Sequence, residues 1–142
     1  MTRAPTPHGQ RKTAGHGRLH PMKHVLLLED DRDVAMMLVQ ILREARYFVS
    51  FATRVVDACD VLARIQVDLL VADVLLPDGT AFRAIDAAKQ HGIPYLLMTG
   101  SAEHMAQLES NGEFHLAKPF RIAEFMGRVR DRIGPAEVIG DN

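Results

Sequence analysis

From residue 24 onward, short apolar runs alternate with stretches in which apolar residues recur every three or four positions. A short apolar run is typical of a strand buried on both faces of a parallel sheet, whereas three- and four-residue steps are typical of an amphipathic helix. The runs predict five strands, at residues 24–28, 48–52, 68–73, 93–98 and 114–117.

Each predicted strand is followed by a helical stretch, the fourth of which (102–110) has few large apolar groups. Asp31 or Asp33 can cap the first helix, Gly92 closes the third, and Gly134 with Pro135 ends the last. The alternation predicts an α/β fold, a doubly wound five-stranded parallel sheet with five helices on its two faces. The expected buried residues are Val34, Met37, Leu38, Ile41, Leu42 and Ala45; Val55, Val56, Cys59, Leu62 and Ile65; Phe82, Ile85 and Ala88; and Ile122, Phe125, Met126, Val129 and Ile133.

Composition divides the chain into one domain and two tails. The 142 residues leave room for a single core. Residues 1–21 hold four basic residues, no acid and, after Met1, one large aliphatic residue, too little apolar surface to offset the entropy of ordering. We therefore expect a disordered basic tail over 1–21, a folded domain over 22–134 and a short tail over 135–142. The net charge of −1 hides an acidic domain, because 13 basic and 18 acidic residues remain after residue 21.

Composition also excludes several classes of protein. The single cysteine, Cys59, rules out an internal disulfide and a thiolate metal cage, and we expect it to be a small buried residue. No run approaches the roughly 20 apolar residues of a membrane span, and no apolar leader begins the chain. We expect a cytoplasmic protein that contacts no membrane. The acidic domain argues against direct nucleic-acid binding, for which the basic tail is only a weak signal.

Polar side chains stand where the predicted strands end. Ligands of an open parallel sheet bind at the carboxyl ends of its strands, so these residues should share one edge. Clustered carboxylates repel one another unless a cation lies among them, and Mg²⁺ suits such oxygens. A phosphoryl group would also explain a lysine and a threonine, with an aspartate as the nucleophile. The strand ends supply Glu29, Asp30, Asp31, Asp73, Thr99 and Lys118.

Four motifs follow one another along the chain: residues 27–31, residues 68–73 with 76–79, residues 98–100 and residues 118–120. In this order they resemble the motifs of the receiver domain of two-component response regulators. The resemblance covers residues 23–133 and implies a flavodoxin-like sheet of strand order 2-1-3-4-5 in a stand-alone, single-domain response regulator.

The resemblance implies that Asp73 accepts a phosphoryl group from a phosphohistidine. Asp30 and Asp73, with the backbone carbonyl of Leu75, would hold Mg²⁺, and Glu29 would act mainly through a metal-bound water. No enzyme is expected beyond Mg²⁺-dependent self-phosphorylation and self-dephosphorylation. The latter should be slow, because neither Leu75 nor Ser101 offers an acid or amide that could position a water.

By the same resemblance, Thr99 and Lys118 would bind phosphoryl oxygens and take part in the switch, in which Thr99 moves. Gly100 and Pro119 would be helpers, with a cis bond before Pro119. Receivers commonly carry an aromatic switch residue three positions before the lysine, where this chain has His115. An imidazole can gain a proton near neutral pH, so we hypothesise that protonation of His115 biases the switch. A half-exposed strand residue without that role is the alternative.

Structural roles compete with these assignments. An acid at a strand end, such as Asp31, can simply cap the following helix. Thr99 or Ser101 can do the same, and Lys118 could be a solvated surface charge. For Asp73 the structural reading is weaker, because it leaves the repulsion among the acids unexplained.

Other functions fit less well. Haloacid-dehalogenase-like phosphatases need an aspartate two residues after the nucleophile, where this chain has Leu75; the phosphatase-like Asp78-Gly79-Thr80 has Leu76 in place of its nucleophile. A flavin carrier needs a phosphate-cradling loop after its first strand, but acids follow here. The stronger alternative is a receiver-fold interaction module that works without phosphorylation.

The partners follow from the same interpretation. After Ile133 too few residues remain for an output domain, so we expect signalling by partner binding or phosphorelay. A sensor histidine kinase or histidine phosphotransfer protein would supply the phosphoryl group, and a downstream protein would respond to the face of the fourth helix, fifth strand and fifth helix. That face also allows a homodimer.

Overall fold

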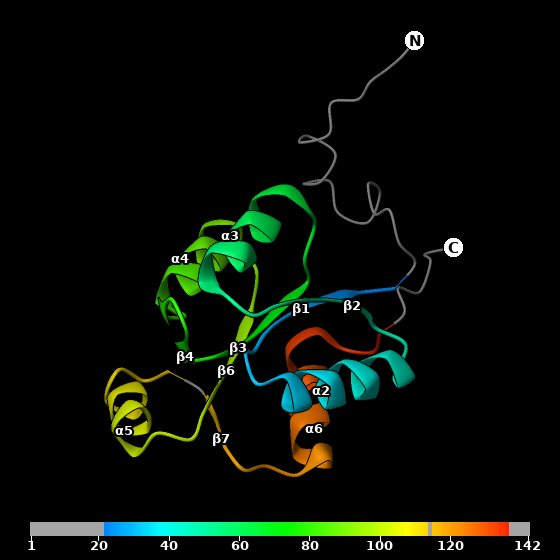
Figure 1. The fold of residues 1–142 in the computed structure, drawn as a ribbon. Coiled ribbons are helices and arrows are strands. Elements are labelled where there is room, and N and C mark those ends of the chain that lie inside the picture. Colours follow the sequence, from blue (N-terminus) through cyan, green and yellow to red (C-terminus); the bar gives the residue numbers. More distant parts are fainter. Residues whose placement is uncertain (1–21, 114, 137–142) are drawn as a thin grey trace.

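A five-stranded parallel sheet forms the centre of the computed structural model, which describes residues 22–113 and 115–136 (Figure 1). Its order, β2-β1-β3-β6-β7, is the predicted 2-1-3-4-5, because β4 and β5 form a separate hairpin. The predicted tail over 1–21, residues 137–142 and Phe114 lie outside the described residues. The sheet strands are β1 (His24–Leu28), β2 (Phe48–Ala52), β3 (Leu69–Asp73), β6 (Tyr95–Thr99) and β7 (His115–Ala117).

Helices cover both faces of the sheet, as predicted (Figure 1). α2 and α6 pack on one core together with Val25 and Leu27 of β1, whereas α3, α4 and Leu108 of α5 pack on the other together with Leu26 and Leu28. This alternation is the two-residue period of a strand buried on both faces. The helices are α2 (Arg32–Glu44), α3 (Val55–Arg64), α4 (Phe82–Gln90), α5 (Ala102–Ser110) and α6 (Ile122–Ile133).

The predicted buried faces of three helices were too wide. Met37 is exposed because Ala35, Leu38, Val39 and Leu42 are the buried residues of α2. In α3 the small Ala58 faces the core, which leaves Val56 exposed, while Ile65 lies at the C-cap. Ile122 is half exposed because it begins α6, one turn before the residues that contact the sheet.

Cys59 is half-buried at the margin of the second core rather than fully buried. Burial raises the pKa of its thiol, which disfavours the reactive thiolate. The position therefore agrees with the structural role expected from the sequence.

A hairpin that the sequence pattern did not predict follows Asp73. β4 (Leu75–Leu76) pairs antiparallel with β5 (Gly79–Thr80), and Pro77 and Asp78 form the hairpin tip between them. Gly79 has φ 129°, a conformation that residues with a Cβ rarely adopt. Leu76 is buried in the second core, whereas the Leu75 side chain faces solvent.

The chain beyond α6 returns to the start of the sheet. Gly134 ends α6 with φ 74°, and its carbonyl accepts a hydrogen bond of 2.7 Å from the hydroxyl of the buried Tyr47. The amide of Lys23 donates to the carbonyl of Ala136 at 2.6 Å, and Ala136 is itself buried. The first residues of the predicted tail over 135–142 thus pack on the domain, while the boundary at residue 134 stays a prediction.

Candidate functional site

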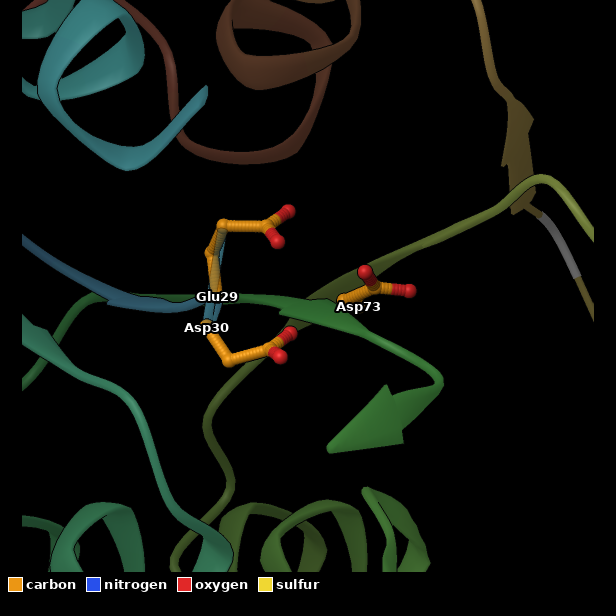
Figure 2. A group of neighbouring side chains, drawn as sticks. All are labelled: Glu29, Asp30 and Asp73. Atoms are coloured by element: carbon orange, nitrogen blue, oxygen red, sulfur yellow. The ribbon is translucent and has the colours of Figure 1, made fainter. Parts of the chain in front are cut away.

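Three carboxylates meet at the carboxyl edge of the sheet. Glu29 and Asp30 follow β1, and Asp73 ends β3; Figure 2 shows the three side chains gathered at the ends of these strands. One oxygen from each lies within 4.8 Å of the others. The cause is the parallel pairing of β1 with β3, in which Leu28 stands beside Ala72 and the two strands end together. The expected convergence of Glu29, Asp30 and Asp73 is therefore observed.

The three acids differ sharply in exposure. Glu29 is fully buried, Asp73 is partly buried and Asp30 faces solvent. Burial raises the pKa of the Glu29 carboxyl, although hydrogen bonds from the Asp31 amide, at 3.0 Å, and from Lys118 act in the opposite direction.

The side chain of Asp31 has a structural role. It accepts hydrogen bonds from the amides of Asp33 and Val34, so the prediction that it caps α2 is confirmed.

Lys118 joins two of these acids. Its Nζ donates to Oε1 of Glu29 at 3.0 Å and to Oδ2 of Asp73 at 2.9 Å. Burial acts to lower the pKa of Lys118, but the hydrogen bonds to Asp73 and Glu29 outweigh it and raise the pKa above its usual value. The lysine therefore stays charged. The Lys118–Pro119 bond is cis, as expected.

Thr99 and Gly100 lie beside this lysine. The amide of Lys118 donates to the carbonyl of Thr99 at 2.9 Å, and a methyl group built on Gly100 would touch Cβ of Lys118 at 3.6 Å, an ordinary contact. Thr99 is buried, and its Oγ1 accepts from the amide of Ser101 at 3.0 Å. Ser101 in turn caps α5 by accepting from the amide of His104 at 3.3 Å. The Thr99 hydroxyl keeps its own proton to donate.

Leu75 and His115 lie at the margin of the site. Leu75 pairs with Thr80 in the hairpin two residues beyond Asp73, and its side chain is 49% exposed. His115 begins β7 and is half-buried, and its carbonyl accepts from Nη1 of Arg128 at 3.3 Å. The metal-ligand role of Leu75 and the switch role of His115 stay predictions.

Sequence reasoning missed the contacts of Asp78, at the hairpin tip. Its Oδ1 and Oδ2 accept from the amides of Val55 and Val56, at 2.9 and 3.2 Å. A signal was present, because α3 begins after Arg54, whose side chain cannot accept a hydrogen bond from an amide. The helix therefore had to obtain an acceptor elsewhere or leave its first amides to water.

The group of side chains fits a hard divalent cation. Its donors are carboxylate oxygens, the ligand type that Mg²⁺ prefers. One lysine compensates only part of the charge of three carboxylates. The same group offers an ammonium and a buried hydroxyl, which suit phosphoryl oxygens.

Comparison with known proteins agrees with this geometry. A family model described as the response regulator receiver domain matches residues 25–130. The transcriptional regulatory protein CusR of Escherichia coli K12 is 32% identical over 123 residues, which span 81% of this chain and 54% of CusR. The chain thus spans about half the length of the curated relatives it matches. No helix among residues 22–113 and 115–136 has the length and apolarity of a membrane span.

Solved structures give the same result. A putative response regulator from Chloroflexus aurantiacus J-10-fl is 30% identical, with a TM-score of 0.69 over 78% of this chain and 97% of that one. The receiver domain of sensor histidine kinase PA1611 from Pseudomonas aeruginosa PAO1, solved with magnesium coordinated in its active-site cleft, is 24% identical, with a TM-score of 0.70 over 79% and 98% of the two chains. The chain belongs to the response regulator receiver domain family of two-component systems.

Proposed function

We propose that Asp73 accepts a phosphoryl group from a phosphohistidine of a sensor histidine kinase or histidine phosphotransfer protein. The observation that carries the proposal is the 2.9 Å contact between Lys118 Nζ and Asp73 Oδ2, beside two further carboxylates. The lysine puts a positive charge where the oxygens of a transferred phosphoryl group would lie, next to the nucleophile.

Exposure selects Asp73 over Glu29 as the acceptor. Both acids bind Lys118, but the side chain of Asp73 is 14% exposed and that of Glu29 only 1%. A carboxylate oxygen of Asp73 would attack phosphorus, the P–N bond to the donor imidazole would break, and the imidazole would keep the electron pair and take a proton. The product is an acyl phosphate on Asp73. Thr99 and Lys118 would donate hydrogen bonds to its oxygens.

The residues present fit a bound Mg²⁺. Asp30 and Asp73, with the backbone carbonyl of Leu75, would hold the ion, and Glu29 would act through a water. When bound, Mg²⁺ would offset the negative charge of the phosphoryl group and the carboxylates. The P. aeruginosa receiver with magnesium in its cleft supports Mg²⁺ as the ion.

The phosphorylated protein would act by binding a downstream protein or by passing the phosphoryl group on. In this proposal it works in the cytoplasm, contacts neither membrane nor nucleic acid, and uses the face of α5, β7 and α6 for a target or a second copy. Its own chemistry is limited to self-phosphorylation and slow self-dephosphorylation. Ser101 Oγ already caps α5, and the apolar Leu75 cannot activate a water.

A small-molecule donor such as acetyl phosphate tests the proposal. With Mg²⁺ present, intact-mass spectrometry should show the gain of one phosphoryl group, which Asp73→Asn or chelation of Mg²⁺ abolishes. Asp60→Asn is the control, because Asp60 is an exposed acid paired with Arg64 on α3, and it should gain the group normally. No gain with any donor would overturn the proposal in favour of a receiver-fold module that works without phosphorylation.

A further inference from the structure

Asp78 connects two parts of the fold that are distant in sequence. It lies in the turn between β4 and β5, and its carboxylate accepts from the amides of Val55 at 2.9 Å and Val56 at 3.2 Å. These amides belong to the first turn of α3, where Arg54 holds the N-cap position without a side-chain hydrogen bond to the helix. Asp78 thus supplies, from another loop, the acceptor that a capping residue ordinarily provides.

The contact is electrostatically favourable although Asp78 faces solvent. The hydrogen bond from the Val55 amide is the main cause that holds the pKa of the Asp78 carboxyl below its usual value; burial opposes it, and the hydrogen bond from Val56 adds to it. The group is therefore charged at neutral pH. A carboxylate at a helix N-terminus also meets the positive end of the helix dipole.

The same hairpin carries Leu75. At its base the amide of Ala81 donates to the carbonyl of Val74 at 2.8 Å, and only two residue pairs follow toward the tip. A two-stranded hairpin this short is marginal without outside contacts. The Leu75 side chain is half exposed, so its backbone is held by the buried neighbours Val74 and Leu76 and by the anchor at Asp78.

We propose that Asp78 is a positioning residue for the phosphoryl site. By anchoring the hairpin tip on α3, Asp78 holds the backbone carbonyl of Leu75 in place for Mg²⁺. The inference rests on the proposed function, which places that carbonyl among the metal ligands. Asp78 would act only through the backbone, without touching the ion or the phosphoryl group.

The test compares Asp78→Ala and Asp78→Asn with Asp57→Ala. Asp57 is an acid in the first turn of α3 itself, so its loss removes the same charge from the same helix end and leaves the hairpin anchor in place. Mg²⁺ affinity would be measured by isothermal titration calorimetry, local opening by hydrogen exchange of the Val55 and Val56 amides, and folding by urea denaturation.

We expect Asp78→Ala to weaken Mg²⁺ binding about tenfold, as loss of an outer-shell contact does, and to speed exchange at both amides. Asp78→Asn keeps one acceptor oxygen, so its Mg²⁺ affinity should fall only roughly threefold, less than the tenfold expected when the whole outer-shell contact is lost. Asp57→Ala should keep the wild-type affinity. A merely structural role would lower the urea midpoint of Asp78→Ala without separating its Mg²⁺ affinity from that of Asp57→Ala.

Two negative results are distinguishable. If the wild-type chain binds Mg²⁺ and is phosphorylated, and Asp78→Asn and Asp78→Ala bind Mg²⁺ as tightly, the inference is overturned while the proposed function stands. If Asp78→Ala does not fold, the Asp78→Asn variant decides alone: an Mg²⁺ affinity equal to that of the wild type overturns the inference. If the wild type binds no Mg²⁺, both are overturned.

Discussion

The ammonium of Lys118 lies 2.9 Å from a carboxylate oxygen of Asp73, although 45 positions separate the two residues in sequence. The same nitrogen lies 3.0 Å from Glu29, whose side chain is 1% exposed. One lysine is therefore the charge partner of both the proposed phosphoacceptor and a buried acid. This double contact links the stability of the fold to the chemistry of the site.

Replacing Lys118 should destabilise the protein in a way that Mg²⁺ reverses. Lys118→Ala leaves the buried Glu29 without its cation and beside Asp73. We expect it to cost about 2 kcal/mol of unfolding free energy at neutral pH, within the range for hydrogen bonds to charged groups. Mg²⁺ should recover part of that loss, because it supplies another positive charge. Urea denaturation with and without Mg²⁺ measures both effects.

The matched control is Lys89→Ala. Lys89 lies 3.7 Å from Glu113 with half of its side chain exposed, and such surface pairs contribute about 0.5 kcal/mol or less. If the two variants lose equal stability, or if Mg²⁺ stabilises neither Lys118→Ala nor the wild type, the role assigned to Lys118 is wrong.

Replacing Thr99 should leave phosphorylation intact but abolish the response of partner binding to it. Thr99→Val removes the acceptor of the Ser101 amide and should cost about 1 kcal/mol of unfolding free energy, whereas Thr99→Ser keeps the hydroxyl. Because Asp73 and Lys118 are unchanged, Thr99→Val should still gain a phosphoryl group. It should lose the difference in partner affinity between the phosphorylated and unphosphorylated protein, measured by pull-down. A normal response would contradict this role.

Asp78 should stabilise the fold in a pH-dependent manner. Its pKa is lowered in the folded state, chiefly by the hydrogen bond from Val55. The stabilisation is therefore complete above the ordinary value of 3.8 and is lost as the pH falls through the lower folded-state value. The melting temperatures of wild type and Asp78→Asn should differ at neutral pH and converge in strong acid. A constant difference would contradict the assignment.

A further prediction concerns His115 and is based only on its position in the sequence. If protonation of its imidazole biases the switch, His115→Phe should remove the change in phosphorylation-dependent partner binding between about pH 6 and pH 8, the range in which histidine titrates. The measurement is partner affinity at both pH values for wild type and variant. Equal pH dependence in the two proteins would contradict the hypothesis.

Periodicity was sufficient to predict the main sheet and its helices, because buried parallel strands and amphipathic helices have distinct patterns. It did not predict the hairpin of β4 and β5, whose two-residue strands are too short to show a period. Exposure of Val56 and Ile122 was also missed, since an apolar residue in the first turn of a helix can fit the stripe and still face solvent.

The candidate site was predictable as a set of residues but not as a set of contacts. Glu29, Asp73 and Lys118 were identified because strand ends of a parallel sheet share one edge. That Lys118 bonds to Glu29 as well as Asp73, and that Asp78 anchors α3, depends on side-chain directions and loop positions, which no local pattern contains.

Locating the phosphoryl group is the most direct test of Asp73 as the phosphoacceptor. After reaction with acetyl phosphate and Mg²⁺, reduction with borohydride would convert an aspartyl phosphate to homoserine with release of phosphate, and peptide mass spectrometry would identify the reduced residue. We expect reduction at Asp73, and none in Asp73→Asn. Reduction at Asp30 or another carboxylate, or no reduction anywhere, would contradict it.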